Sequence, residues 1–213
     1  MTNLIEFKLD VLYLKAAVLA AAKKDVREQL NGVYFNLING CLQSTNGHIA
    51  FITQPNIFKA YSDSDCKGFL MPIDFAQQVS AIKTGKKEED RQLYISFSTQ
   101  SRTLTARLNS NIVSANIQDL PFPNLNFVYQ NETKKSWEPI FTQTYSAQNL
   151  AIASKIATAL KPLIQSKDDT PSIEFKLRDN TAILNINENM VHLVLAGMNP
   201  DTEFQYFDLK AQK

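Results

Sequence analysis

KKDVREQLNGVYFNLINGCLQSTNGHIA, residues 23 to 50, is the stretch that decides the fold of this chain. Three Asn-Gly pairs divide it, and such pairs are the strongest short signal for tight turns between antiparallel strands. The runs that follow the pairs are 33–38, 41–45 and 48–53. The stretch therefore predicts the end of a helix, a turn, and then a meander of three short strands.

The residues before this stretch predict one strand and one helix. Ile5, Phe7 and Leu9 alternate with charged residues, which is the pattern of a half-buried strand. Asp10 is a favourable N-cap, and residues 11–24 are rich in Ala and Leu, as in a helix. The first unit of the chain is thus expected to be a strand, a helix and three strands.

The same order of elements occurs twice more along the chain. In the second unit a strand at 68–73 precedes a helix capped by Asp74, and the third unit has a long helix from Ser146 to about Leu163. The alternating runs that predict the remaining strands are 93–97, 104–108, 113–117, 140–145, 173–177, 182–186 and 190–195. Repeats of this kind indicate units that associate to complete a sheet.

These units predict an α+β fold with helices on one face of antiparallel sheet. The run Leu120-Pro121-Phe122-Pro123 and the polar residues after it interrupt the pattern, which indicates a domain boundary. We therefore expect one domain of two units at residues 1–130. The third unit and an aromatic tail would occupy residues 131–213.

Composition and charge exclude several classes of protein. The 213 residues carry a net charge of only +1, so nucleic-acid binding would need lysines gathered on one face. Cys41 and Cys66 lie in no CxxC motif and predict free thiols. The first residues are too charged for a signal peptide, and the apolar run 11–22 is too short to span a bilayer. A cytoplasmic protein without a membrane partner is expected.

No motif predicts catalysis. The six glycines form no phosphate-binding loop, and His48 and His192 lie far apart in sequence, with a structural role expected for His192. We expect no cofactor, no metal and no enzymatic activity. An enzyme is kept as a further hypothesis. A nuclease-like activity that is lost on mutating Asp168 and Asp169 would revive it.

Positively charged residues follow the expected helices. Each unit carries lysines on its helix or just after it, which would give a basic surface for a phosphate backbone without base readout. The alternative is that lysines are simply common on helices. The candidate DNA-binding residues are Lys15, Lys23, Lys24, Arg27, Lys83, Lys86, Lys87 and Lys155.

Two short motifs give the chain a family resemblance. Residues 25–33, DVREQLNGV, and the turn Thr45-Asn46-Gly47-His48 resemble the middle domain of the bacterial DNA sliding clamp, the β subunit of DNA polymerase III. Phe122-Pro123 matches the Phe-Pro that closes that domain in the family, and the end of the third unit is similar to the clamp's final segment.

The resemblance implies a protein that encircles duplex DNA and tethers polymerases. In the family, basic inner helices slide on phosphates and an apolar pocket captures short peptides of polymerases and repair proteins. Carried over by position, the peptide-binding pocket comprises Leu30, Thr45, Gly47, His48, Pro123, Val128, Val194, Leu195 and Met198. The implied partners are duplex DNA, polymerase and other clamp-binding peptides, a clamp loader and further copies of the chain in a homo-oligomer.

The chain also departs from the family. Ile49-Ala50 replaces an Arg-Leu pair, Phe127 replaces a pocket arginine, and the final Pro-Met-Arg has no counterpart. Three units instead of six suggest a shortened clamp, with a phage or a plasmid as one conceivable source. The favoured hypothesis is a clamp-like processivity factor in DNA replication. The alternative is a clamp-derived module that forms no ring and regulates or mimics the host clamp.

Overall fold

The computed structural model describes residues 4–60, 66–125, 145–164, 171–178, 181–186 and 190–196. Within these residues the fold is α+β, with two antiparallel sheets and three α-helices, as the sequence predicts. The helices are α1 (Val11–Ala20), α2 (Ile73–Ser80) and α4 (Ala147–Leu160), with 3₁₀ turns η1 (Glu28–Leu30), η2 (Glu89–Arg91) and η3 (Lys161–Leu163). The strands are β1 (Leu4–Asp10), β2 (Gly32–Asn36), β3 (Cys41–Thr45), β4 (Ile49–Thr53), β5 (Gly68–Pro72), β6 (Gln92–Ser98), β7 (Thr103–Leu108), β8 (Asn111–Asn116), β9 (Ile173–Arg178), β10 (Thr181–Ile186) and β11 (Val191–Ala196).

The first two units exchange their opening strands. β1 pairs with β6 in a sheet of order β1-β6-β7-β8, whereas β5 pairs with β2 of the first unit. Each meander is therefore completed by the strand that opens the other unit. This exchange joins the two units into one body, and the sequence pattern alone did not reveal it.

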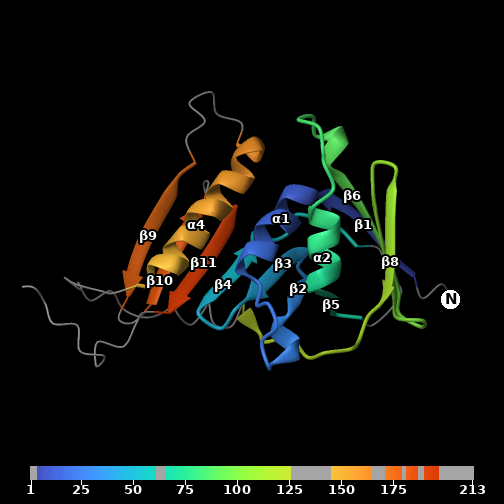
Figure 1. Cartoon of the computed structure of the whole chain (residues 1–213), viewed down its shortest axis with the longest axis horizontal. Helices are drawn as coiled ribbons and strands as arrows, with labels where there is room; N and C mark the ends of the chain where they lie inside the picture. Colours follow the sequence, from blue (N-terminus) through green and yellow to red (C-terminus); the bar gives the residue numbers. More distant parts are fainter. Residues whose placement is uncertain are drawn as a thin grey trace, which may run out of the picture.

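The third unit extends the sheet of the first. β11 pairs with β4 in an antiparallel ladder that matches Val194 with Ala50, which gives a seven-stranded sheet of order β5-β2-β3-β4-β11-β10-β9. The three helices lie on the same side of this sheet, with α1 between α2 and α4 (Figure 1). The opening strand expected at 140–145 and the boundary expected at residue 130 fall outside the described residues, apart from Tyr145.

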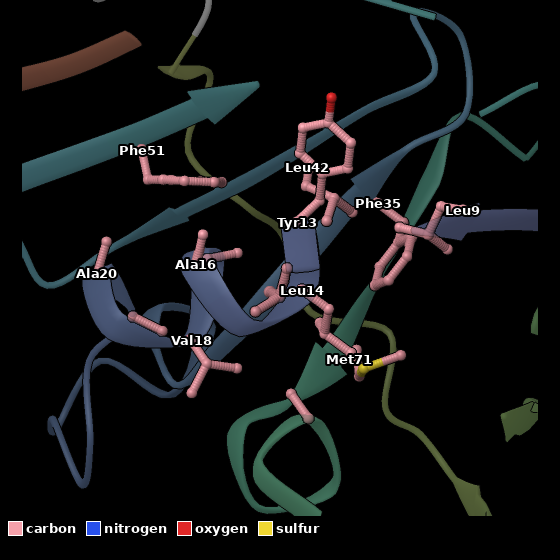
Figure 2. Packing of buried hydrophobic residues seen from close by; sticks show 14 of the residues in the cluster. Leu9, Tyr13, Leu14, Ala16, Val18, Ala20, Phe35, Leu42, Phe51 and Met71 are labelled. Atoms are coloured by element: carbon pink, nitrogen blue, oxygen red, sulfur yellow. The ribbon is translucent and has the colours of Figure 1, made fainter. Parts of the chain in front are cut away.

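Helix α1 is the centre of the core. The Asp10 carboxylate accepts a hydrogen bond from the Leu12 amide at 2.9 Å and forms a buried ion pair with Arg91 at 2.8 Å. Of the ten helical residues only Lys15 and Leu19 are not buried, as expected for a helix that is apolar on all sides. Figure 2 shows its side chains packed among Phe35, Leu42, Phe51 and Met71.

Several predicted boundaries need correction. α1 ends at Ala20 because Ala21 is extended and the Ala22 amide bonds to the Thr45 carbonyl instead, so Lys23 and Lys24 lie beyond the helix. Asp74 lies in the first turn of α2, and Pro72 is its N-cap. Residues 58–60 form no strand, and Phe58 is buried and stacks on Phe7.

Candidate functional site

A pocket opens on the face of the seven-stranded sheet that points away from the helices. Leu42 and Phe51 enter the helix-side core, so by strand alternation Thr45 and Ala50 point to the other face. The volume of this outer-face pocket is about 320 Å³. It is lined by Arg27, Leu30, Thr45, Gly47, His48, Ile49, Ala50, Pro123, Leu125, Val194 and Ala196.

The pocket floor is the seam between the first and third units. Ala50 and Val194 face each other across the β4–β11 ladder and belong to a small apolar cluster with Ile52 and Leu125. Phe122 packs against this cluster, and its ring stacks on Tyr34 with centroids 4.9 Å apart. The segment 121–125 is thereby held against the sheet and forms one wall.

The β3–β4 turn forms the rim. The Asn46 side-chain oxygen accepts hydrogen bonds from the amides of His48 and Ile49, both at 2.9 Å, and the Thr45 hydroxyl accepts one from the Gly47 amide at 3.0 Å. Gly47 has φ +91°, a conformation that favours glycine. The turn therefore holds the exposed His48 at the pocket edge through short-range bonds.

Arg27 is oriented by Asp25. The Asp25 carboxylate accepts hydrogen bonds from the backbone N, Nε and Nη2 of Arg27 at 2.9, 3.0 and 2.9 Å. These side-chain and backbone hydrogen bonds lower the pKa of Asp25 to about 2, so the pair stays charged at neutral pH. A Cβ at position 47 would lie only 2.8 Å from Arg27 Nη2, so the guanidinium packs directly over Gly47.

The loop that carries Arg27 is tied to the second unit. The Asn31 side chain bonds both the amide and the carbonyl of Asp25 at 2.8 Å, and the Asn31 carbonyl accepts from the Ile73 amide at 2.9 Å. Leu30 is buried beside this anchor. The position of Arg27 is thus fixed by the start of α2.

His192 lies on the same face of the sheet, opposite Ile52. Its Nδ1 is 2.8 Å from the Asn185 oxygen, and the Asn185 amide donates to Glu174 at 2.7 Å. Burial lowers the pKa of His192, which favours the neutral ring. These contacts agree with the structural role expected for this histidine.

The structure brings together six of the nine residues assigned to the pocket from the family resemblance: Leu30, Thr45, Gly47, His48, Pro123 and Val194. Leu195 is a correction, because strand alternation turns it into the helix-side core, where it is fully buried. Val128 and Met198 lie outside the described residues.

Sequence reasoning left five residues of the lining out of the predicted pocket. Ala196 follows from the strand alternation that excludes Leu195, and Leu125 is the first apolar residue after Pro123. Both residues could therefore have been assigned to the pocket from the sequence. Ile49 and Ala50 were noted only as departures from the family. Arg27 was predicted only as a candidate DNA-binding residue, and the structure places it in the pocket lining.

The candidate DNA-binding lysines are spread over the helices and their exits. Lys15 is half-buried between α1 and the end of α2, with Nζ 3.5 Å from the Ile82 carbonyl, and burial lowers its pKa. It is therefore a poor member of an exposed basic surface. The exposed lysines of the set are Lys23, Lys24, Lys83, Lys86, Lys87 and Lys155.

Two further hollows lie among the described residues and contain none of the six converging residues. The larger, of about 840 Å³, lies against the four-stranded sheet beside Tyr94, Arg107 and Ile112. The other, of about 520 Å³, lies over the Asp10–Arg91 ion pair. In the described ranges no cluster of His, Cys, Asp or Glu is placed to hold a metal ion, and no helix there is long and apolar enough to cross a membrane.

Comparison with known proteins shows similarity in structure alone. No protein-family model matches the chain. A search of curated proteins also finds no match. Solved structures of bacterial sliding clamps, in contrast, superpose over almost the whole chain.

The DNA polymerase sliding clamp of Bacillus subtilis has a TM-score of 0.57 at 9% identity, covering 92% of this chain and 65% of the clamp. The DNA polymerase III beta chain of Streptococcus pneumoniae gives 0.56 at 11%, over 92% and 65%. The Bartonella birtlesii clamp, solved bound to griselimycin, gives 0.57 at 16%, over 91% and 66%.

These similarities establish the fold. The chain has the α+β sliding-clamp fold and spans slightly less than two thirds of the length of the clamps that it resembles.

Proposed function

We propose that this protein is a sliding-clamp-like processivity factor that tethers DNA polymerase or repair proteins through the outer-face pocket while its helix side rests on duplex DNA. The observation that carries the proposal is the convergence of residues as distant in sequence as Leu30 and Val194 in one pocket. Those residues were assigned from the family resemblance alone. The proposed role is non-catalytic.

The pocket suits a short peptide with apolar anchor residues. Its volume of about 320 Å³ lies at the lower end of ligand pockets, enough for a few side chains rather than a folded domain. Ala50, Leu125 and Val194 supply an apolar floor, and Arg27 supplies a fixed positive charge at the edge. Anchors buried in such a pocket carry most of the binding energy of a peptide.

The replaced residues alter what the pocket accepts. Ile49 is fully buried, and Ala50 places a small side chain at the floor, where the family resemblance led us to expect leucine. The small side chain of Ala50 leaves the floor more open, and Ile49 and Phe127 supply neither of the two arginine charges that the family resemblance led us to expect. We propose that affinity here depends chiefly on the size of the apolar anchors.

Duplex DNA would contact the helix side. Lys83 and Lys155 come from different units and are exposed at or near helices that lie on one side of the seven-stranded sheet (Figure 1). Lysines that contact phosphates without base contacts give binding that is independent of sequence and sensitive to salt. Lys87 is partly neutralised by Glu89 at 3.4 Å, so it would contribute least.

The end strands of the sheets would mediate self-association. β8 and β9 lie at opposite ends of the molecule in Figure 1, and each pairs on one side only with another described strand. β8 contains no charged residue, and Ile112 on β8 and Phe175 on β9 are exposed. Unprotected strand edges pair readily with other chains, so head-to-tail assembly into a ring would cover both.

Peptide binding tests the pocket directly. A fluorescent peptide from the polymerase of the same source should bind the full-length protein, and griselimycin should compete with it. The substitution Val194→Asp would place a charge on the floor and should abolish binding, whereas Ile112→Lys, at the distant β8 edge, should leave it unchanged. Binding that survives Val194→Asp would contradict the proposed site.

Solution mass separates the ring from the alternative of a module that docks on the host clamp. Light scattering over a concentration series should give a discrete oligomer that Ile112→Lys disrupts. A monomer that instead associates with the purified host clamp would favour the regulatory module.

A further inference from the structure

The described chain ends at the rim of the outer-face pocket. Ala196 is the last residue of β11 and lines the pocket, and its amide donates a hydrogen bond to the His48 carbonyl at 2.9 Å. The last described residue of the chain therefore lies at the pocket. The 17 residues from 197 to 213 follow from this point.

These residues include a segment with the chemistry of a pocket ligand. Residues 201–209, DTEFQYFDL, which we name the distal segment, hold four large apolar side chains: Phe204, Tyr206, Phe207 and Leu209. They also hold three carboxylates, Asp201, Glu203 and Asp208, and no basic residue. The segment thus combines apolar anchors with a net charge of −3.

The outer-face pocket complements both properties. Its floor is apolar, through Ala50, Leu125 and Val194, and among the described residues its lining includes the Arg27 guanidinium and no acidic side chain. Asp25 is fully engaged in orienting Arg27 and does not line the pocket. Acidic residues beside an aromatic anchor would therefore meet a positive edge.

The connecting length is sufficient. Phe204 follows Ala196 by eight residues, which can span up to about 26 Å when extended. The width of a pocket of about 320 Å³ is much shorter than this reach. The chain can therefore turn back and place the segment in the pocket from which it departs.

We propose that the distal segment occupies the outer-face pocket of its own chain, with aromatic side chains on the apolar floor and carboxylates toward Arg27. The segment thereby competes with external peptides and makes access to the pocket conditional. This inference rests on the proposed function in assigning the pocket a peptide ligand, but it is tested without polymerase or DNA.

The expected effect follows from tethering. A segment joined by a short linker has an effective concentration on the order of millimolar at its site. If the free segment binds with a dissociation constant of roughly 100 μM, the tethered copy weakens any competing peptide by about tenfold. An external peptide that binds the pocket tightly can still displace the tethered segment despite this tenfold loss of affinity.

The test uses full-length protein and a fluorescein-labelled synthetic peptide of residues 199–213 as the probe. The triple variant Phe204→Ser/Tyr206→Ser/Phe207→Ser removes the anchors from the tethered copy, and fluorescence anisotropy should then report binding of the probe about tenfold tighter than to the unaltered protein. The matched control Gln205→Ala in the same segment should bind the probe like the unaltered protein.

A second pair of variants tests the charge contact. In the triple-variant background, Arg27→Ala should weaken probe binding several-fold, whereas Lys59→Ala, which removes an exposed positive charge outside the pocket lining, should not. An equal loss with both substitutions would indicate general electrostatics and overturn the specific contact with Arg27.

Two other outcomes overturn the inference. If the probe binds the unaltered protein and the triple variant equally, or binds neither, the distal segment does not occupy the pocket of its own chain. The proposed function is tested separately, because a polymerase peptide can still bind the pocket in that case. A concentration-dependent oligomer that the triple variant abolishes would show that the segment enters the pocket of a second copy instead.

Discussion

The outer-face pocket and the lysines of the helix side are built in opposite ways. The pocket depends on a few side chains held in place by hydrogen bonds and packing, as in the Asp25–Arg27 pair and the Phe122–Tyr34 stack. Apart from the half-buried Lys15, the lysines are exposed and scattered, and one of them, Lys87, is paired with a neighbouring glutamate.

This difference predicts how the binding free energy of each region is divided among its residues. A pocket concentrates affinity in a small number of contacts, so one substitution can abolish it. A phosphate-binding surface divides affinity among many charges, each worth little and each screened by salt. Mutation should therefore affect the two regions on different scales, and pH and salt should separate them.

After the charged floor substitution Val194→Asp, the largest effect is expected for Gly47→Val. A β-branched residue at φ +91° is strained by about 1–3 kcal/mol, and its Cβ would displace Arg27. Peptide affinity should fall by about 30-fold or more, equivalent to about 2 kcal/mol, in an anisotropy titration.

The control for strain is Gly40→Ala, at φ +59° and away from the pocket lining. It should lower the melting temperature without changing the affinity of the folded protein. If Gly40→Ala weakens peptide binding as much as Gly47→Val, the effect at Gly47 reflects loss of folding. The result would then contradict a specific role of Gly47 in the binding pocket.

Leu125→Ala should have the next largest effect. Leu125 is buried in the small cluster under the segment 121–125, and its truncation should cost about 2 kcal/mol of unfolding free energy and about tenfold in peptide affinity. Chemical denaturation and anisotropy measure the two quantities. A loss of stability with unchanged affinity would show that this segment is not a wall of the binding site.

Acid should lower the stability of the fold through His192. The pKa of His192 is lowered in the fold, so the unfolded chain binds more protons and stability falls as pH decreases through about 6.5. Thermal melts between pH 7.5 and 5.5 should show this slope, and His192→Gln should flatten it.

Asp25 should not contribute to that slope. Its pKa is lowered to about 2, so its stabilising charge is present above the ordinary value near 3.8 and is lost only as pH falls through about 2. A stability slope between pH 7.5 and 5.5 that persists in His192→Gln would contradict the assignment to His192.

The smallest effects are expected on the helix side. Lys23→Glu/Lys24→Glu should weaken DNA binding several-fold and reduce the dependence of log affinity on log salt by about 2, at about 0.9 per phosphate contact. Lys8→Glu/Lys59→Glu, a double charge reversal of the same size at exposed positions beside the four-stranded sheet, is the control. An equal loss in the control would mean that net charge, not the helix side, governs DNA binding.

Local sequence signals were enough to predict most elements of the fold. Asn-Gly turns and strand alternation predict β3 with its observed bounds and β2 and β4 to within two residues. The exchange of β1 and β5 between units could not be predicted, because it depends on pairing over some 90 residues, as between Leu4 and Ser98. α1 was predicted too long because Ala21 and Ala22 favour helix, but the Ala22 amide bonds to β3.

The candidate site was predictable only in part. The resemblance gave residues of the β3–β4 turn and Val194, but the pairing of β11 with β4 that unites them was not predictable. The role of Arg27 at the pocket edge depends on its contact with Asp25 and Gly47, which residue type and charge alone do not reveal.

Primer extension tests the central proposal most directly. On a long, linear primed template, whose free ends let a ring thread on without a loader, the cognate polymerase would be challenged with excess trap DNA after one binding event. The proposal predicts much longer products with the full-length protein and no gain with Val194→Asp. Product lengths that are unchanged by the protein, or lengthened equally by the variant, would contradict a pocket-tethered processivity factor.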